Sequence, residues 1–203
     1  MVSPLFANIY LHELDVEMRE AGLVMVRYAD DAVVLCRSRE EAESALARMR
    51  AWVSANGLTL HPGKTYVGDC RVAGRGFEFL GYRFEAGQRW VRKKSLMSLR
   101  DQIRAKTKRN GGQSIESVVA SLNPTLKGWY DYFQHAHRFT FSSLDGFVRR
   151  RLRAVLRRQK HRPGQGRCLR DHKQWPNTFF AALGLFTMYA AHHSARQSRC
   201  GHN

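Results

Sequence analysis

The chain has 203 residues, of which 43% are hydrophobic and only five are proline, and this composition excludes a fibre or a disordered tail. No stretch approaches the roughly 18 apolar residues that cross a bilayer, and the first residues do not have the pattern of a signal peptide. We therefore expect a cytoplasmic protein without a membrane partner. Its formal net charge is +17, from 34 Lys and Arg against 17 Asp and Glu.

The positive charge is concentrated in one part of the chain. Residues 1–80 carry nine basic and eleven acidic side chains, whereas residues 81–203 carry twenty-five and six. A basic segment with interleaved aromatic residues is typical of a protein that binds nucleic acid, and a basic surface kept for solubility is the alternative. The four cysteines lack the paired spacing of a disulfide framework or a zinc site, so we expect reduced thiols.

The first elements in the chain are a helix and a hairpin. A helix is expected over residues 3–20, because Ser3 can cap its first amides and Pro4 fits the first turn. Two apolar runs, 23–28 and 32–36, then flank a tight polar turn. This pattern predicts two antiparallel strands covered by helices.

A second helix is predicted after Ser38, which forms a capping box with Glu41, and this helix ends at Asn56-Gly57. Short strands are expected next, at residues 58–60, 65–67, 77–84 and 89–91. The order of elements predicts an α+β fold in which helices lie on one face of an antiparallel sheet.

After Lys93 the pattern becomes helical. The predicted helices cover residues 95–108, 114–121, 124–136, 143–159 and 177–193. Because the fold class and the composition change at the same place, we predict one domain over residues 1–93 and a helical domain over residues 94–203.

The turn Tyr28-Ala29-Asp30-Asp31 places two adjacent carboxylates at the tip of an apolar hairpin. Crowded like charges cost free energy unless a cation lies between them, and carboxylate oxygens suit Mg²⁺. Two such ions can activate a hydroxyl and stabilise the leaving oxygen in a phosphoryl transfer. The alternative is that the aspartates only favour the turn.

An arginine-rich helix is the clearest candidate for RNA binding. Apolar residues from Leu144 to Leu156 recur three or four apart and form one stripe, which leaves the arginines facing outward. These are Arg149, Arg150, Arg151, Arg153, Arg157 and Arg158. Outward guanidiniums repel one another unless phosphates neutralise them.

Four aromatic residues lie close together upstream of that helix, namely Trp129, Tyr130, Tyr132 and Phe133. They could stack on unpaired bases or form core, and their helical spacing favours core.

The chain resembles the reverse transcriptases of bacterial group II introns. The segments that carry the resemblance are Ser3–Leu11, Tyr28–Asp31, Gly57–Thr65, Phe77–Tyr82 and Leu122–Arg158. The resemblance implies half of a reverse-transcriptase palm in residues 1–93, followed by a helical thumb and maturase domain in residues 94–203.

The resemblance also implies residue roles. Asp30 and Asp31 would hold Mg²⁺ at the catalytic centre, and Lys64 would protonate the departing pyrophosphate, although a solvated turn residue is the alternative reading of this lysine. The residues implied to bind nucleotide or primer are Ser3, Pro4, Phe6, Tyr28, Ala29, Leu80 and Gly81. The residues implied to bind intron RNA are Lys127, Arg149, Arg150, Arg153, Arg157 and Arg158.

The implied function is RNA-directed DNA synthesis on an RNA template with a DNA primer, together with intron splicing. Enzymes of this family also use an earlier palm aspartate and basic fingers that these 203 residues do not include. We therefore expect a C-terminal portion that does not polymerise DNA unaided. A non-catalytic RNA-binding module and a DNA-binding protein with an incidental hairpin are the alternatives, and dimerisation is left open.

Overall fold

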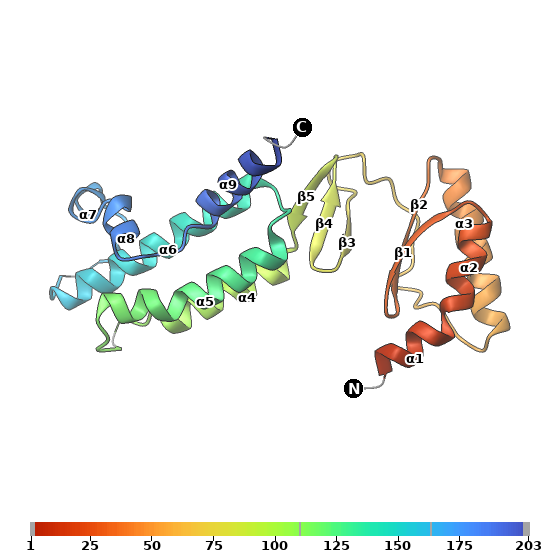
Figure 1. Cartoon of the computed structure of the whole chain (residues 1–203), viewed down its shortest axis with the longest axis horizontal. Helices are drawn as coiled ribbons and strands as arrows, with labels where there is room; N and C mark the ends of the chain where they lie inside the picture. The colour runs from red at the N-terminus through yellow and green to blue at the C-terminus, as the bar shows by residue number, and fades with distance from the viewer. Residues whose placement is uncertain (1–2, 110, 163, 201–203) are drawn as a thin grey trace. The chain divides into compact units, whose positions relative to one another are not determined.

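The computed structural model describes residues 3–109, 111–162 and 164–200 (Figure 1). The chain divides into two compact units, one of residues 1–80 with 84–87 and the other of residues 81–83 with 88–203. In the part of the chain that is described, no helix combines the length and the hydropathy needed to cross a membrane.

The first unit is a hairpin covered by helices. Its elements are α1 (Ser3–Tyr10), α2 (His12–Glu20), β1 (Val24–Tyr28), β2 (Asp31–Leu35) and α3 (Arg39–Ala55). β1 and β2 pair antiparallel from Val24↔Leu35 to Tyr28↔Asp31. Helices α2 and α3 lie on one side of the hairpin (Figure 1). Leu14, Met18 and Ala45 form the core between them.

The single helix expected over residues 3–20 is two helices, with the break at Leu11. The two parts have different environments. Leu14 and Met18 of α2 are buried, whereas Phe6 and Ile9 of α1 are both 64% exposed. Because only α2 packs on the hairpin core, its apolar face does not continue into α1.

The capping box at the start of α3 is present in modified form. The Ser38 hydroxyl accepts a hydrogen bond from the amide of Glu41, and the Glu41 carboxylate accepts one from the amide of Arg37 instead of Ser38. The strands expected at 58–60 and 65–67 are absent from the described chain. The amides of Lys64 and Thr65 both donate to the carbonyl of His61, so this segment forms a turn.

A three-stranded sheet follows, in the order β3 (Phe77–Phe79), β4 (Tyr82–Glu85), β5 (Gln88–Val91). The single strand expected over residues 77–84 is therefore a hairpin. Its turn, Leu80-Gly81, has φ values of 49° and 80°. Two successive positive φ values identify a type I′ turn, which suits the right-handed twist of the flanking strands.

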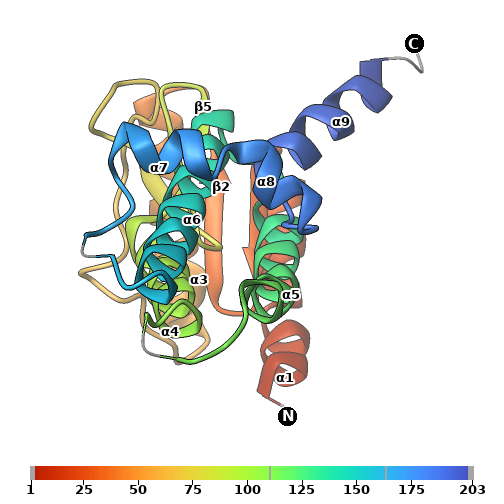
Figure 2. The same cartoon turned by 90° about the vertical axis from the view of Figure 1, so that its left-hand side faces the viewer.

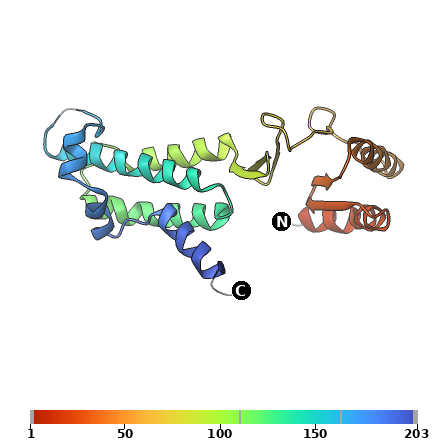
Figure 3. The same cartoon turned by 90° about the horizontal axis from the view of Figure 1, so that it is seen from above.

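The second unit is helical. Its helices are α4 (Lys93–Lys106), α5 (Ile115–Phe133), α6 (Arg138–Gln159), α7 (Leu169–Gln174), α8 (Asn177–Ala182) and α9 (Met188–Cys200). Figure 2 shows α4, α5 and α6 alongside one another, with α7 and α8 across the bundle near the end of α6. Helix α9 packs on α6 and diverges from the bundle toward its C-terminal end (Figure 3). Strands with flanking helices followed by a helical region confirm the predicted fold class.

The break expected before Pro124 does not occur, because this proline lies inside the continuous helix α5. Leu122 and Leu126 on either side of it are fully buried, and their packing outweighs the backbone bond that proline removes. Asn123 makes two hydrogen bonds to the segment between α8 and α9. Its amide donates to the carbonyl of Gly184 and its side-chain oxygen accepts from the amide of Phe186.

The last predicted helix is also divided, into α8 and α9. Asp145 of α6 is 3% exposed and accepts hydrogen bonds from the amides of Met188 and Tyr189 at 3.1 and 3.0 Å. A buried carboxylate therefore caps the start of α9 and fixes it on α6. Burial raises the pKa of Asp145 above its ordinary value, against the lowering effect of these two bonds.

Candidate catalytic hairpin and nucleic-acid interface

The two aspartates lie at the tip of the β1–β2 hairpin. Asp31 forms the last strand pair with Tyr28, and Ala29-Asp30 makes the two-residue turn. Tyr28, Asp30 and Asp31 are exposed. Ala29 has a φ of 53°, which is uncommon for a residue with a side chain and marks backbone strain in the turn.

Arg27 braces this turn from the core side of the hairpin. Its Nε and Nη2 donate to the two carboxylate oxygens of Asp15 on α2, with Nε–Oδ1 at 2.7 Å. Its Nη1 donates to the carbonyl oxygen of Ala29 at 2.8 Å and to the side chain of Asn8 at 3.1 Å. One guanidinium thus joins two helices to the turn.

The charge of Arg27 is matched by Asp15. The side chain of Arg27 is only 9% exposed, and its hydrogen bonds to Asp15 raise the pKa of the guanidinium further. The carboxylate that pairs with Arg27 is therefore that of Asp15 on α2.

The donor chemistry of the turn fits Mg²⁺. Two adjacent exposed carboxylates offer hard oxygen ligands with room for water and substrate phosphates, which is how proteins commonly hold this ion. Within the described ranges, no group of three or more His, Cys, Asp and Glu side chains is placed to hold a metal.

Phe6 and Lys64, which are implied to take part in catalysis or substrate binding, lie at separate places in the first unit. Phe6 projects from α1 with 64% of its side chain exposed, and Lys64 is an exposed residue of the turn after His61. The side chains of Ser3 and Pro4 lie outside the described part of the chain. No contact between Lys64 and the aspartates is observed among the described residues, so its catalytic role stays a prediction.

Gly81 belongs to the second unit and lies close to its core. A Cβ at this position would lie 3.2 Å from Cζ of Phe133. Its carbonyl accepts a hydrogen bond from the amide of Arg92 at 2.9 Å. Leu80, the other residue of the turn, is 36% exposed, so the turn offers one apolar side chain to solvent.

The expectation that all the arginines of α6 face outward is wrong. Arg153 is 2% exposed, donates to the carbonyl of Trp175 at 3.0 Å, and lies over the ring of Phe180. Arg157 donates to the carboxylate of Asp171 at 2.7 Å. The sequence pattern missed these roles because the partners lie in α7, in α8 and in the short segment between them, and the helical periodicity of α6 says nothing about those segments.

Asp171 is held in the charged form by this pairing. Its side chain is 3% exposed. Burial alone would raise the pKa of Asp171, but hydrogen bonds from Cys168 and Arg157 outweigh that effect and lower it.

Three guanidiniums gather around one aromatic ring between α4 and α6. Their carbon atoms Cζ lie 5.9, 5.5 and 5.1 Å from the ring centroid of Phe147, and they belong to Arg100, Arg104 and Arg150. We call these four residues the Phe147 cluster. Burial, together with the nearby charges of Arg167 and Arg104, lowers the pKa of Arg150. Arg104 of this cluster also pairs with the carboxylate of Asp101 on α4.

The remaining predicted RNA ligands and the aromatics are divided between surface and core. Lys127 and Arg158 are exposed and Arg149 is half-buried. Tyr130 and Phe133 are buried, as the helical spacing predicts, whereas Tyr132 is 56% exposed.

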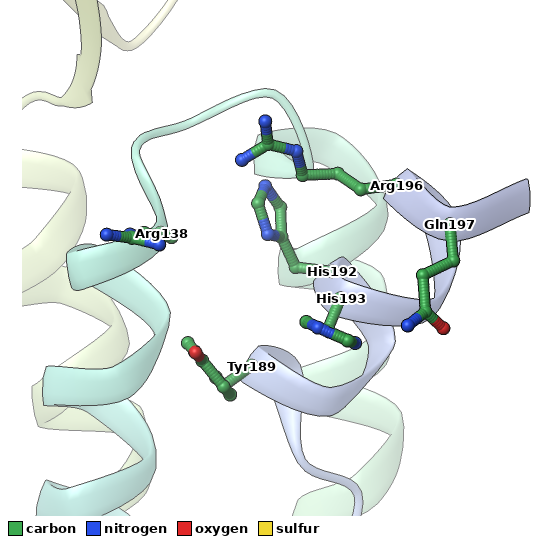
Figure 4. Close-up of a pocket in the computed structure, with 6 residues that line it drawn as sticks. All are labelled: Arg138, Tyr189, His192, His193, Arg196 and Gln197. Atoms are coloured by element: carbon green, nitrogen blue, oxygen red, sulfur yellow. The ribbon is translucent and has the colours of Figure 1, made fainter. Parts of the chain in front are cut away.

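A second basic site lies between the start of α6 and α9 (Figure 4). A cavity of about 270 Å³ is lined there by Arg138, Tyr189, His192, His193, Arg196 and Gln197. We call it the α6–α9 pocket. Sequence reasoning missed it, because Arg138 lies more than fifty positions before the lining residues of α9, and only the folding of α9 onto α6 brings them together.

Two known protein families match this chain, one in each half. The family model described as "Reverse transcriptase (RNA-dependent DNA polymerase)" matches residues 1–84, which include the hairpin. The model described as "Group II intron, maturase-specific domain" matches residues 96–175, which include the Phe147 cluster. No curated protein sequence matches the chain significantly. The two matches follow each other without overlap, and together they confirm the resemblance of this chain to the group II intron reverse transcriptases and maturases.

Proposed function

We propose that the helical unit binds intron RNA through the Phe147 cluster, and that the hairpin contributes the Mg²⁺ ligands Asp30 and Asp31 to RNA-directed DNA synthesis. Reverse transcriptases and maturases act on RNA, and the family generally uses Mg²⁺. The specific sites, and the division into a palm over residues 1–93 and a maturase domain over residues 94–203, are proposals.

The observation that carries the RNA-binding proposal is the gathering of three guanidiniums on one ring. Three guanidiniums held on one ring add their positive charge at one place, which attracts an anionic ligand such as a phosphate. Each guanidinium can meet a phosphate with two parallel hydrogen bonds. Exposed Arg158 and Lys127, and half-buried Arg149, add further positive charge to the helical unit. Arg153 and Arg157 are occupied by protein partners and are left out of the proposed interface.

At the hairpin, the proposed role of this chain's residues is to position charge. Arg27 fixes the turn, so that the carboxylates of Asp30 and Asp31 are presented outward from a rigid strand end. The bound Mg²⁺ would activate the primer hydroxyl and stabilise the departing pyrophosphate. The exposed turn Leu80-Gly81 would support the primer end, and Lys64 would donate a proton to the leaving group.

We also infer that the 203 residues alone do not extend a primer. Two adjacent carboxylates are fewer ligands than a two-metal site uses, and the resemblance implies a third from an earlier palm strand. Incubation of the chain with a primed RNA template, Mg²⁺ and deoxynucleotides should give no DNA product. DNA synthesis that is lost in Asp30→Asn would contradict this inference.

The RNA-binding proposal is tested by titrating labelled group II intron RNA with the full chain at several salt concentrations. Each lost phosphate contact lowers the slope of log K against log salt by about 0.7–0.9, so Arg100→Ala, Arg104→Ala and Arg150→Ala should each lower it. Arg39→Ala, an exposed arginine on α3, is the matched control. Equal affinity of the wild-type chain for intron RNA and for duplex DNA would instead favour a DNA-binding protein.

A further inference from the structure

We propose that the α6–α9 pocket binds one phosphate of the RNA backbone and gives the helical unit a second anchoring point. The proposal rests on the RNA-binding function inferred above. It concerns a site whose lining lies outside the Phe147 cluster and, for α9, outside the segment that matches the maturase family model.

The chemistry of the lining selects a ligand that accepts hydrogen bonds. Arg138 and Arg196 have only donors, and the imidazoles of His192 and His193 and the amide of Gln197 can each donate. Of the described residues that line the pocket, none is acidic. A ligand with several acceptor oxygens and negative charge, such as a phosphate group, therefore fits better than a cation or a neutral ligand.

The side chains come from two elements and meet across the pocket. Figure 4 shows Arg196 and His192 projecting from the same side of α9, with Arg138 across from them at the start of α6. The cavity volume of about 270 Å³ lies just below the roughly 300 Å³ at which pockets for whole small molecules begin. A single phosphate with part of its sugar is consistent with that size.

The pocket is held in shape by the core of the helical unit. Asp145 fixes the first amides of α9, and the ring of His192 lies 5.0 Å from the ring of buried Phe141. Arg138 lies over the ring of Phe139 at 5.4 Å. These contacts restrain both walls of the pocket, so that the guanidiniums lose little freedom when a phosphate enters.

The test uses the full chain, a fluorescein-labelled group II intron RNA, and the variants Arg138→Ala, Arg196→Ala and their combination. The double variant should lower the salt slope by about 0.7–0.9, which is the loss of one phosphate contact, and each single variant should weaken binding and lower the slope by no more than that. Because both arginines hold the same phosphate, the double variant should lose less affinity than the sum of the two single losses. Arg170→Ala, on α7 at the other end of α6, removes the same charge away from the pocket and should leave the slope unchanged.

The outcomes separate this site from the wider function. If the wild-type chain does not bind the RNA, the proposed RNA-binding function fails and the pocket proposal fails with it. If the wild type binds while Arg138→Ala and Arg196→Ala keep its affinity and slope, only the pocket proposal is overturned. Equal losses in these variants and in Arg170→Ala would show an effect of net charge and would also overturn it. Thermal melting of every variant checks that the fold is kept. Because Arg138 and Arg196 lie on different helices, the pocket proposal can still be tested with one variant if the other does not fold.

Discussion

The guanidinium of Arg27 donates a hydrogen bond to the carbonyl oxygen of Ala29, 2.8 Å away, inside the turn that carries Asp30. Arg27→Met keeps the apolar stem but removes this bond and leaves Asp15 without its partner. We expect a loss of about 1–3 kcal/mol in local stability, because a charged hydrogen-bonded group loses its partner. Hydrogen exchange of the amides in residues 24–35 should become faster.

The matched control for that change is Arg39→Met. Arg39 pairs with Glu43 in an exposed ion pair on α3, where 79% and 55% of the two side chains are accessible. Exposed ion pairs contribute little to stability, so hydrogen exchange of the hairpin amides should not change in Arg39→Met. The same acceleration in both variants would show that Arg27 does not brace the turn.

Asp30→Asn and Asp31→Asn should each weaken the binding of Mn²⁺, used as a paramagnetic substitute for Mg²⁺, by roughly tenfold, because each removes a charged oxygen ligand. Water-proton relaxation measures this binding directly. Asp69→Asn is the control, since its ion pair with Arg71 lowers the pKa of Asp69 to about 2 and occupies the carboxylate. Unchanged Mn²⁺ affinity in both hairpin variants would remove the metal role from the turn.

Gly81→Ala and Gly87→Ala separate backbone strain from packing. Both glycines have positive φ, 80° and 71°, so each change costs about 1–2 kcal/mol in backbone strain. A Cβ at Gly81 also meets the ring of Phe133, whereas nothing lies within 4 Å of one at Gly87. Urea denaturation should therefore show a larger loss of stability for Gly81→Ala. Equal losses would mean that Phe133 moves aside without cost.

Arg153→Met and Arg158→Ala should have opposite effects. Arg153 is buried, so its replacement strands the carbonyl of Trp175 and should cost about 1–3 kcal/mol in unfolding free energy. Arg158 is exposed, so its replacement should leave the melting temperature unchanged but weaken RNA binding. Loss of RNA affinity in a fully folded Arg153→Met would restore Arg153 as an RNA ligand.

Asp171 should make the stability of the helical unit depend on acid pH. Its pKa is lower in the folded chain than in the unfolded chain. The stabilisation is therefore complete above the unfolded value of about 3.9 and disappears as the pH falls through the folded value. The melting temperature should fall between pH 5 and pH 2, and it should fall less in Asp171→Asn. Parallel curves for the two proteins would assign the acid sensitivity to other carboxylates.

Local signals in the sequence were sufficient for much of the fold. The Ser38 cap, the turn at Ala29-Asp30 and the helical second half depend on neighbours within a few residues, and the structure has all three. The family and the fold class followed from the same motifs. Where tertiary packing competes with a local rule, prediction was wrong, as at Pro124, where buried neighbours keep the helix continuous.

In the candidate sites, too, local features could be predicted from the sequence, whereas contacts between distant segments could not. Exposure of Asp30 and Asp31 could be read from a turn between two strands. Arg27 carries a weaker signal, a charged residue at an inward position of an alternating strand, and its partner Asp15 could not be identified from spacing. Neither the burial of Arg153 nor the α6–α9 pocket has a local signature, because each depends on segments that meet only in the folded chain.

The ring of Phe147 has a consequence for the speed of recognition. An aromatic face attracts a cation without neutralising it, so Arg100, Arg104 and Arg150 are oriented before any polyanion arrives and still project their field into solvent. The positive field should therefore attract a polyanion from a distance, and the three arginine side chains should need little rearrangement when it binds. Replacing Phe147 by leucine should slow association more than it hastens dissociation, although the residue itself forms no hydrogen bond through its side chain.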